Sequence, residues 1–402
     1  RPYNILAVTF TNKAAREMEQ RVSALLSDHK QGITLGTFHS TCARILRRET
    51  DLLPLKSNFA IFDADDQHSV VKRAVKDLEL NEKMYRPESV HAAISRAKNE
   101  LYFPKDFPVA NYRDEVVKRV YQRYQDLLVA SNAVDFDDLL LYTAWLLEEN
   151  QAVRERWARR FEHILVDEFQ DTNEAQYKIV RHLASYHGNL FVVGDEDQSI
   201  YRWRGADYRN MQRFEEDYPK ARKILLEQNY RSTQNVLDAA RAVIDRNLYR
   251  TPKRLHSDRG EGEKLSLYEA SDDYAEAAYV VDTIATIVAS RRARGSDFAV
   301  MYRTNAQSRL LEESFLRAGL PYRLVGAQRF YGRREIKDLI AYLRLVHNPE
   351  DEVSLARVIN TPTRGIGDKT VATLLVRAQQ AGTGAGMVVM DLARGEASPY
   401  WA

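Results

Sequence analysis

Residues 164–171 read Ile164-Leu-Val-Asp-Glu-Phe-Gln-Asp171. The three apolar residues predict a buried strand, and two adjacent carboxylates, Asp167 and Glu168, follow at its C-terminal end. Ligands bind at that edge of open α/β sheets. One carboxylate suits Mg²⁺, and a second can orient or deprotonate an attacking water. Taken alone, the pattern is equally compatible with a solvated Asp-Glu turn, so both interpretations stay open.

A second polar loop follows the next predicted strand, residues 190–193. It runs from Gly194 to Gly205 and contains Gln198, a residue suited to sensing a neighbouring phosphate. Near its end, aromatic and basic residues interleave in the order Tyr201, Arg202, Trp203, Arg204. Single-stranded nucleic acids bind such surfaces, because each base stacked on an aromatic ring contributes about 1–3 kcal/mol. The alternative, a core Trp flanked by snorkelling arginines, fits a polar loop less well.

Outward from these loops, strand-like runs alternate with helical periodicity, which predicts parallel α/β sheets with crossover helices. Strands are expected at 5–9, 33–37, 164–166, 190–193, 223–226, 265–269, 298–302 and 322–325. Helices are expected at 13–26, 40–49, 174–184, 234–246, 274–289 and 308–318. Residues 59–135 are mostly helical and rich in Lys, Arg and Tyr, which predicts an inserted helical domain, and the chain is helical again from about Tyr331.

Composition narrows the class of protein. The 402 residues carry 59 Lys and Arg against 57 Asp and Glu, which excludes a bulk polycation but not a local basic groove for nucleic acid. The single cysteine, Cys42, excludes an intrachain disulfide and a multi-cysteine metal site. Apolar runs such as 139–147 are shorter than the ~20 residues that span a bilayer. We therefore expect a protein of the reducing cytoplasm.

Six motifs together resemble the UvrD/PcrA/Rep-type superfamily 1 DNA helicases. Three are long: Asp167-Glu-Phe-Gln-Asp-Thr172, Gly194-Asp-x-Asp-Gln-Ser-Ile-Tyr-x-Trp-Arg-Gly-Ala206 and Gln228-Asn-Tyr-Arg-Ser-Thr233. The others are Ala7-Val-Thr-Phe-Thr-Asn-Lys-Ala-Ala15, Gly36-Thr-Phe-His-Ser40 and Val300-Met-Tyr-Arg-Thr-Asn-Ala-Gln-Ser-Arg309. They follow the family's order from residue 1 to about residue 380. Phe169 stands where the family often has Tyr, a conservative departure.

The resemblance implies an α/β fold with two RecA-like P-loop NTPase motor domains, built on parallel sheets, that carry mainly helical inserted subdomains. ATP would lie between the motor domains. Residues 1–58 and 136–226 would form the first motor domain, and 59–135 its helical insertion. Residues 227–330 would form the N-terminal half of the second motor domain, and 331–402 the start of the second insertion.

The resemblance also implies roles for single residues, with ATP and Mg²⁺ as cofactors. Asp167 would bind Mg²⁺ with Glu168 beside it in the metal site, and Glu168 would activate water. Gln198 would sense the γ-phosphate, Tyr230 would stack on adenine, and Arg204 and Arg231 would contact phosphates as arginine fingers do. The implied DNA track comprises Phe10, Thr11, Asn12, Thr37, His39, Tyr201, Trp203, Tyr302, Arg303 and Asn305. Alone, His39 would more often be a capping or core residue, and Phe10 a core residue.

The implied activity is that of an ATP-dependent 3′–5′ DNA helicase or translocase in repair or replication. Its partners would be single-stranded DNA, junctions of single- and double-stranded DNA, and repair or replication proteins. We expect a monomer or weak dimer in the bacterial cytoplasm, associated with the nucleoid and not with a membrane. A motor subunit of a recombination helicase–nuclease and a non-catalytic DNA-binding remnant remain as alternatives.

The phosphate-binding loop Gly-x4-Gly-Lys-Ser/Thr does not occur in this sequence. Residues 365–370, Gly-Ile-Gly-Asp-Lys-Thr, have another spacing and follow a helix; they suit a helix–hairpin–helix turn or an ordinary glycine-rich helix start equally well. In the family the loop lies upstream of the strand predicted at 5–9. We therefore expect this sequence to be an internal piece of a longer helicase that has little or no ATPase activity alone.

Overall fold

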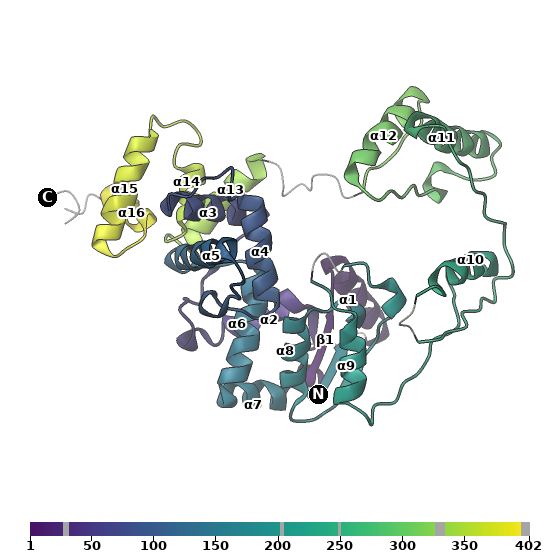
Figure 1. The fold of residues 1–402 in the computed structure, drawn as a ribbon, viewed down its shortest axis with the longest axis horizontal. Coiled ribbons are helices and arrows are strands. Elements are labelled where there is room, and N and C mark those ends of the chain that lie inside the picture. The colour runs from purple at the N-terminus through teal and green to yellow at the C-terminus, as the bar shows by residue number, and fades with distance from the viewer. Residues whose placement is uncertain (27–31, 202–204, 248–250, 326–333, 395–402) are drawn as a thin grey trace. The chain divides into compact units, whose positions relative to one another are not determined.

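The computed structural model describes residues 1–26, 32–201, 205–247, 251–325 and 334–394. The chain divides into two compact units (Figure 1). The first comprises Arg1–Lys223 together with Arg334–Ala402, and the second comprises Ile224–Arg333.

The first unit is built on a four-stranded parallel sheet with the strand order β2-β1-β5-β6. Its strands are β1 (Ile5–Thr9), β2 (Thr34–Thr37), β5 (His163–Val166) and β6 (Leu190–Val192). Ala7 of β1 lies opposite Leu35 of β2 and Leu165 of β5, so β1 is an inner strand. The parallel sheet confirms the strand predictions for this part of the chain. Because all four strands run the same way, the loops that follow them meet at one edge.

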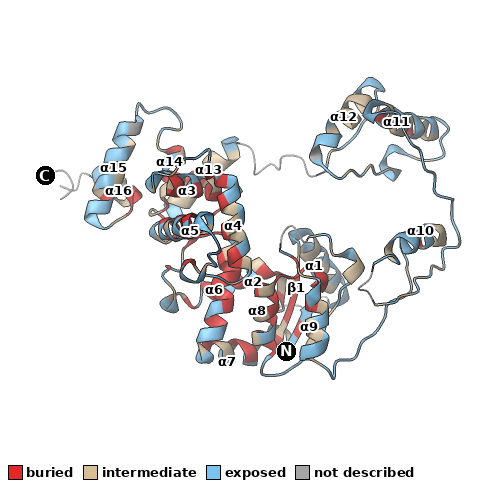
Figure 2. Cartoon of the chain, in the orientation of Figure 1, coloured by how far each residue is buried: buried red, intermediate tan, exposed pale blue. Residues whose placement is uncertain are grey.

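Six helices surround this sheet: α1 (Asn12–Leu26), α2 (Phe38–Leu46), α6 (Phe136–Glu149), α7 (Gln151–Arg160), α8 (Glu174–Ala184) and α9 (Arg209–Asp217). Helix α6 packs between α2 and α8. The apolar sides of these three helices share one core with β1 and β5, visible as the continuous buried region in Figure 2. Core residues include Leu6, Val8, Ile45, Leu140, Ile164 and Ile179.

Helices α3 (Ala64–Asp77), α4 (Pro87–Asn99) and α5 (Tyr112–Ala130) form the predicted helical segment, which has its own core. Its two ends are joined by short parallel strands, β3 (Ala60–Ile61) and β4 (Ala133–Val134). The sequence did not predict these strands, because two residues are too few to show a periodicity. The pairing of β3 with β4 places the end of the helical segment beside its beginning, next to the core of the parallel sheet.

A buried ion cluster, made of Lys98, Asp135 and Asp138, lies where the helical segment meets α6. The Lys98 Nζ is 2.7 Å from a carboxylate oxygen of Asp135 and 2.7 Å from one of Asp138, and all three residues are fully buried. The Tyr124 hydroxyl also donates to Asp135, at 2.8 Å. Burial disfavours the charged form of Lys98, but the two carboxylates outweigh it and hold its pKa above the ordinary value. Such a cluster persists only where every charge has a partner.

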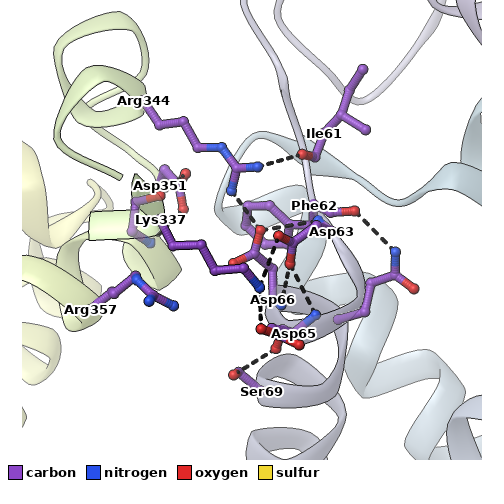
Figure 3. A network of polar contacts seen from close by, with 12 residues as sticks. Ile61, Phe62, Asp63, Asp65, Asp66, Ser69, Lys337, Arg344, Asp351 and Arg357 are labelled. Carbon is purple, nitrogen blue, oxygen red and sulfur yellow. Dashed lines mark hydrogen bonds and ion pairs between the residues drawn. The ribbon is translucent and has the colours of Figure 1, made fainter. Parts of the chain in front are cut away.

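Helices α13 (Arg334–His347) and α14 (Glu352–Val358) pack against the helical segment through ion pairs, which we call the charged seam (Figure 3). The Arg344 guanidinium lies 2.5 Å from Asp66 and donates to the Ile61 carbonyl at 3.1 Å. Lys337 pairs with Asp65 and, at 3.5 Å, with Asp63. Two further pairs are Arg73–Glu352 at 2.8 Å and Lys56–Glu350 at 2.6 Å.

Helices α15 (Asp368–Ala381) and α16 (Ala385–Ala393) follow the seam and pack on each other around a small core that includes Leu374 and Val388. They continue the helical character expected for this part of the chain. Within the described ranges, no helix combines the length and the apolar character needed to cross a membrane.

The second unit contains the helices α10 (Gln234–Ile244), α11 (Asp273–Ala289) and α12 (Ser308–Arg317), all close to prediction. The strands predicted at 223–226, 265–269, 298–302 and 322–325 were wrong, because none of these residues forms a strand. In the described part of this unit, the backbone pairing between Gln228 and His256 is an isolated bridge. A strand needs a neighbour for its backbone groups, and without one Leu267 and Met301 stay 98% and 92% exposed.

Candidate functional site

The C-terminal edge of the parallel sheet gathers four loops that carry predicted site residues. The segments at the ends of β1, β2, β5 and β6 contain, in that order, Phe10–Asn12, Thr37–His39, Asp167–Glu168 and Gly194–Gln198, where Thr37 ends β2, His39 lies in the first turn of α2 and Asn12 begins α1. The first and third loops are in contact, because the Thr9 hydroxyl lies 3.4 Å from Asp167 Oδ2 and the Asp167 amide donates to the Val8 carbonyl at 2.9 Å. The parallel sheet therefore brings residues of these four motifs to one edge.

The two carboxylates differ in their surroundings. Asp167 is half-buried at the end of β5, whereas Glu168 is exposed and adopts a left-handed backbone with φ of 53°. A non-glycine residue in that region is strained by about 1–3 kcal/mol, and such residues cluster at functional sites. The chain then enters a short 3₁₀ helix, Phe169–Asp171, anchored by the fully buried Phe169. The turn therefore has a rigid base and an exposed carboxylate at its tip.

Gln170 is a residue whose role the sequence did not predict. It is 1% exposed, and its side-chain Nε2 donates to Glu168 Oε2 at 2.7 Å. Its Oε1 accepts the Asp195 amide at 3.0 Å. A Cβ atom at Gly194 would lie 2.7 Å from the same Oε1, so a larger residue there would displace the Gln170 side chain. The sequence hints at this role only by the position of Gln170, two residues after Glu168.

Gln198 lies in the loop after β6, in the short helix Glu196–Gln198. Its side chain is exposed, and its Nε2 donates to Asp195 Oδ2 at 2.9 Å. Asp195 also caps the short helix by accepting the Asp197 amide at 3.0 Å. The amide predicted to sense a phosphate is therefore held at the loop's surface by its own neighbour.

Asp171 is a buried carboxyl group close to this site. Its Oδ1 makes no hydrogen bond, and the residue is 6% exposed. Burial, and after it the negative charge of Glu168, raises the pKa of Asp171 to about 6. The unfolded chain would have the ordinary value of about 3.9. The folded state therefore binds more protons than the unfolded state between these values, and this contribution to stability falls as the pH rises through them.

We expect Asp171→Asn to stabilise the protein at pH 8 by about 1 kcal/mol, because it removes a buried charge that lacks a full set of partners. At pH 4 the gain should vanish, since the folded wild type is then protonated. Urea unfolding in EDTA at both pH values measures the difference. Asp51→Asn, at an exposed position, is the control. A gain of the same size at pH 4 and pH 8 would contradict the assignment.

Two aromatic pairs involve residues of the predicted DNA track. The rings of Phe10 and Tyr201 have centroids 4.9 Å apart, and those of His39 and Phe136 meet edge to face at 5.8 Å. Burial lowers the pKa of His39 to about 4, so its ring is neutral at pH 7 and cannot attract phosphate as a cation. Phe10 and Tyr201, predicted from distant motifs, are thus brought together by the fold.

The hydroxyl groups on the track have a local role as well. Thr37 caps α2 by accepting the Ser40 amide at 3.3 Å, and Thr11 accepts the Ala14 amide at 3.1 Å beside Asn12, the first residue of α1. Trp203 and Arg204 lie outside the described residues.

The remaining predicted residues belong to the second unit. Tyr230 is 76% exposed, and its hydroxyl donates to Gln228 Oε1 at 2.7 Å. The Arg231 amide donates to Asn229 Oδ1 at 2.9 Å.

Further along this unit, Tyr302 is half-buried and Arg303 is exposed, and Asn305 is the first residue of the short helix Asn305–Gln307. The side chain of Gln307 spans the turn from Arg303 to this short helix, because its Oε1 accepts the Arg303 amide at 3.0 Å.

The donor set suits a magnesium ion held mainly by other ligands. Among the described residues, no group of three or more His, Cys, Asp or Glu side chains could enclose a metal. Mg²⁺ commonly takes one or two carboxylates and completes its shell with waters and phosphate oxygens. Asp167 and Glu168 supply that number of carboxylates at the ligand-binding edge of the sheet.

Two known domain families match this chain. Residues 1–219 match the UvrD/REP helicase N-terminal domain, and residues 224–400 match the UvrD-like helicase C-terminal domain. The chain belongs to the UvrD/REP helicase family. The resemblance predicted from the six motifs is therefore confirmed.

Individual relatives show how much of the family's length this UvrD/REP chain represents. It is 50% identical over 368 residues to the ATP-dependent DNA helicase PcrA of Bacillus subtilis, covering 91% of this chain and 50% of the relative. It is 48% identical over 381 residues to PcrA of Staphylococcus epidermidis, covering 94% of this chain and 52% of the relative. The chain thus spans about half the length of the curated relatives it matches.

Proposed function

We propose that this chain supplies an ATP-hydrolysing edge and a single-stranded DNA surface of an ATP-dependent 3′–5′ DNA helicase or translocase. The observation that carries the proposal is the meeting of Asp167–Glu168, the Gln198 loop and the Phe10–Tyr201 ring pair on loops of one parallel sheet. The relatives at about 50% identity are named ATP-dependent DNA helicases. We call a protein that contains this chain together with a phosphate-binding loop the full-length protein.

In the proposed hydrolysis, the Glu168 carboxylate orients a water molecule and accepts its proton as the water attacks the γ-phosphate. Asp167, with Glu168 beside it, would hold Mg²⁺, which when bound would supply neutralisation of charge on the phosphate oxygens. The Gln198 amide contacts the γ-phosphate, and Arg204 and Arg231 stabilise charge on the transferred group. Tyr230 stacks on the adenine.

DNA is proposed to cross the same edge. Bases stack on the rings of Phe10, Tyr201 and Trp203, each worth about 1–3 kcal/mol. In the first unit, Thr11, Asn12, Thr37 and His39 are proposed to contact the sugar–phosphate backbone or the bases. The resemblance assigns Tyr302, Arg303 and Asn305, of the second unit, to contacts with the same DNA. DNA binding and ATP hydrolysis are proposed to share one edge of the sheet, so domain movements driven by ATP can move the bound DNA.

The 402-residue chain should bind single-stranded DNA with an affinity that falls as salt rises. Three neutralised phosphates would give a slope of log K against log salt of about −2. Tyr201→Ala should weaken binding to oligo(dT) by about 5–100-fold through loss of one stacking surface. Fluorescence anisotropy measures both effects, with Tyr186→Ala, at an exposed tyrosine outside the predicted track, as a control. Binding without salt dependence, or an equal loss in both variants, would contradict the DNA track.

The chain alone should turn over ATP at least about 100-fold more slowly than the full-length protein. Its sequence lacks the lysine and the amides of a phosphate-binding loop, and loss of even one donor to developing negative charge costs about 10²–10³ in rate. A coupled ATPase assay with saturating oligo(dT) compares the two proteins. Equal turnover would show that another part of the chain holds the phosphates.

Two other functions would use the same fold. A motor subunit of a recombination helicase–nuclease would carry a nuclease activity that the full-length protein can be assayed for. A non-catalytic DNA-binding remnant would bind DNA but show no turnover even with a phosphate-binding loop. The same proposal includes the domain organisation predicted from the sequence. It also includes action as a monomer or weak dimer in the bacterial cytoplasm near the nucleoid, together with repair or replication proteins.

A further inference from the structure

Gln170 lies between the two loops that carry the proposed water-activating and phosphate-sensing residues. We propose that Gln170 is a positioning residue that fixes the Glu168 carboxylate and links it mechanically to Gln198. This inference rests on the proposed ATPase function. It adds a residue that acts through Glu168 rather than on the reacting groups themselves.

The contacts form a continuous chain of hydrogen bonds between the two functional residues. Gln170 Nε2 donates to Glu168 Oε2 at 2.7 Å, and Gln170 Oε1 accepts the Asp195 amide at 3.0 Å. Asp195 Oδ2 then accepts Gln198 Nε2 at 2.9 Å. One buried side chain therefore spans the gap between the loops after β5 and β6.

The partners of Gln170 fix the orientation of its amide group. Its NH₂ faces a carboxylate, which only accepts, and its carbonyl faces a backbone N–H, which only donates. A flipped amide would place oxygen against oxygen and nitrogen against nitrogen, so both bonds would be lost together. The backbone carbonyl of Gln170 also accepts the Ser199 hydroxyl at 3.3 Å, which ties it to the second loop again.

Glu168 needs such support because its side chain is exposed. An unrestrained glutamate samples several rotamers, and holding one of them costs side-chain entropy. A bond from a buried amide selects one rotamer before the water arrives. Reacting groups must be held close to their working geometry, and a misplacement of about 1 Å can reduce the rate 100-fold.

The link also gives the second loop a way to act on the first. When Gln198 engages a phosphate, a shift of its loop displaces the Asp195 amide, and Gln170 transmits that shift to Glu168. The absence of a side chain at Gly194 lets the loops approach closely, since a Cβ there would lie 3.1 Å from the backbone nitrogen of Gln170. Hydrolysis is thereby coupled to correct phosphate binding.

The test uses steady-state ATPase kinetics of the full-length protein with saturating oligo(dT). Gln170→Met keeps the length of the side chain but removes both hydrogen bonds, and Gln170→Glu keeps the acceptor but places a carboxylate against Glu168. We expect kcat to fall at least about 10-fold in both variants. The KM for ATP should change less than threefold, because substituting a residue that makes no contact with ATP leaves the ground-state affinity intact.

The matched control is Gln67→Met in α3. Gln67 is also buried, at 6% exposure, and donates to the Phe62 carbonyl at 3.0 Å, but it lies in the helical segment and not in these loops. It should lose thermal stability as Gln170→Met does while keeping its kcat. This comparison separates positioning from a general loss of stability.

Three results would overturn the inference. These are a Gln170→Met enzyme with kcat within twofold of wild type, an effect confined to KM, and a Gln67→Met enzyme that loses kcat equally. A wild-type full-length protein that binds oligo(dT) but hydrolyses no ATP would instead overturn the proposed function, and this inference with it. If Gln170→Met unfolds, the near-isosteric Gln170→Glu decides by the same criteria.

Discussion

The Glu168→Gln variant of the full-length protein should lose DNA-stimulated ATP turnover by about 10²–10⁴-fold, the contribution of a positioned general base. The amide retains the size of the carboxylate but cannot accept the proton of the attacking water. Because Glu168 is exposed at the tip of its turn, the substitution should leave the fold unchanged. ATP should still bind, since the phosphate contacts come from other residues.

Single-turnover hydrolysis and equilibrium binding of a fluorescent ATP analogue separate these two effects. Glu115→Gln, on an exposed position of α5, is a control that should behave as wild type. Normal hydrolysis by Glu168→Gln would show that this carboxylate does not activate water. A loss of analogue binding equal to the loss of turnover would assign it to ground-state binding.

Replacing Lys98 with Met should destabilise the protein by about 3–5 kcal/mol, because two buried carboxylates would lose their shared cation. Asp135 and Asp138 are both fully buried, so water cannot take the place of the ammonium group. In the first unit this loss corresponds to a drop in Tm of about 10 °C. Thermal unfolding followed by circular dichroism measures it.

Lys72→Met is the matched control, since Lys72 is exposed on α3 of the same helical segment. It should change Tm by less than about 2 °C, as surface substitutions away from special features do. A loss below about 1 kcal/mol for Lys98→Met would show that the carboxylates become protonated or find water without large cost. Either result measures how firmly the helical segment is fixed to α6.

The sequence predicted the first sheet well because its strands carry a strong local signal. Residues such as Leu6, Val8, Ile164 and Val166 lie in short apolar runs that end in polar loops, and the structure buries them together. The apolar runs at 265–269 and 298–302 have the same local signal but no strand neighbours in the described chain. Local pattern therefore predicted strand character, while pairing decided whether a strand forms.

At the candidate site too, the motifs predicted which residues matter, whereas the fold decided which of them come into contact. The motifs placed Asp167, Glu168 and Gln198 at strand ends, and parallel strands brought those ends together. Gln170 escaped prediction because its importance comes from a contact with Asp195, 25 residues away, that no periodicity reports. The buried ion cluster is similar: Lys98 and Asp135 lie 37 residues apart and look like surface charges in the sequence.

The charged seam has a consequence for biosynthesis. Lys337 follows its partner Asp65 by 272 residues, and Glu352 follows Arg73 by 279. At roughly 5–20 residues per second, a ribosome needs about 15–55 s to make the intervening chain. The nascent helical segment therefore folds around its own core with three aspartates at one corner still uncovered. A translation pause inside that interval would prolong the exposure of these three aspartates to cations in the cell.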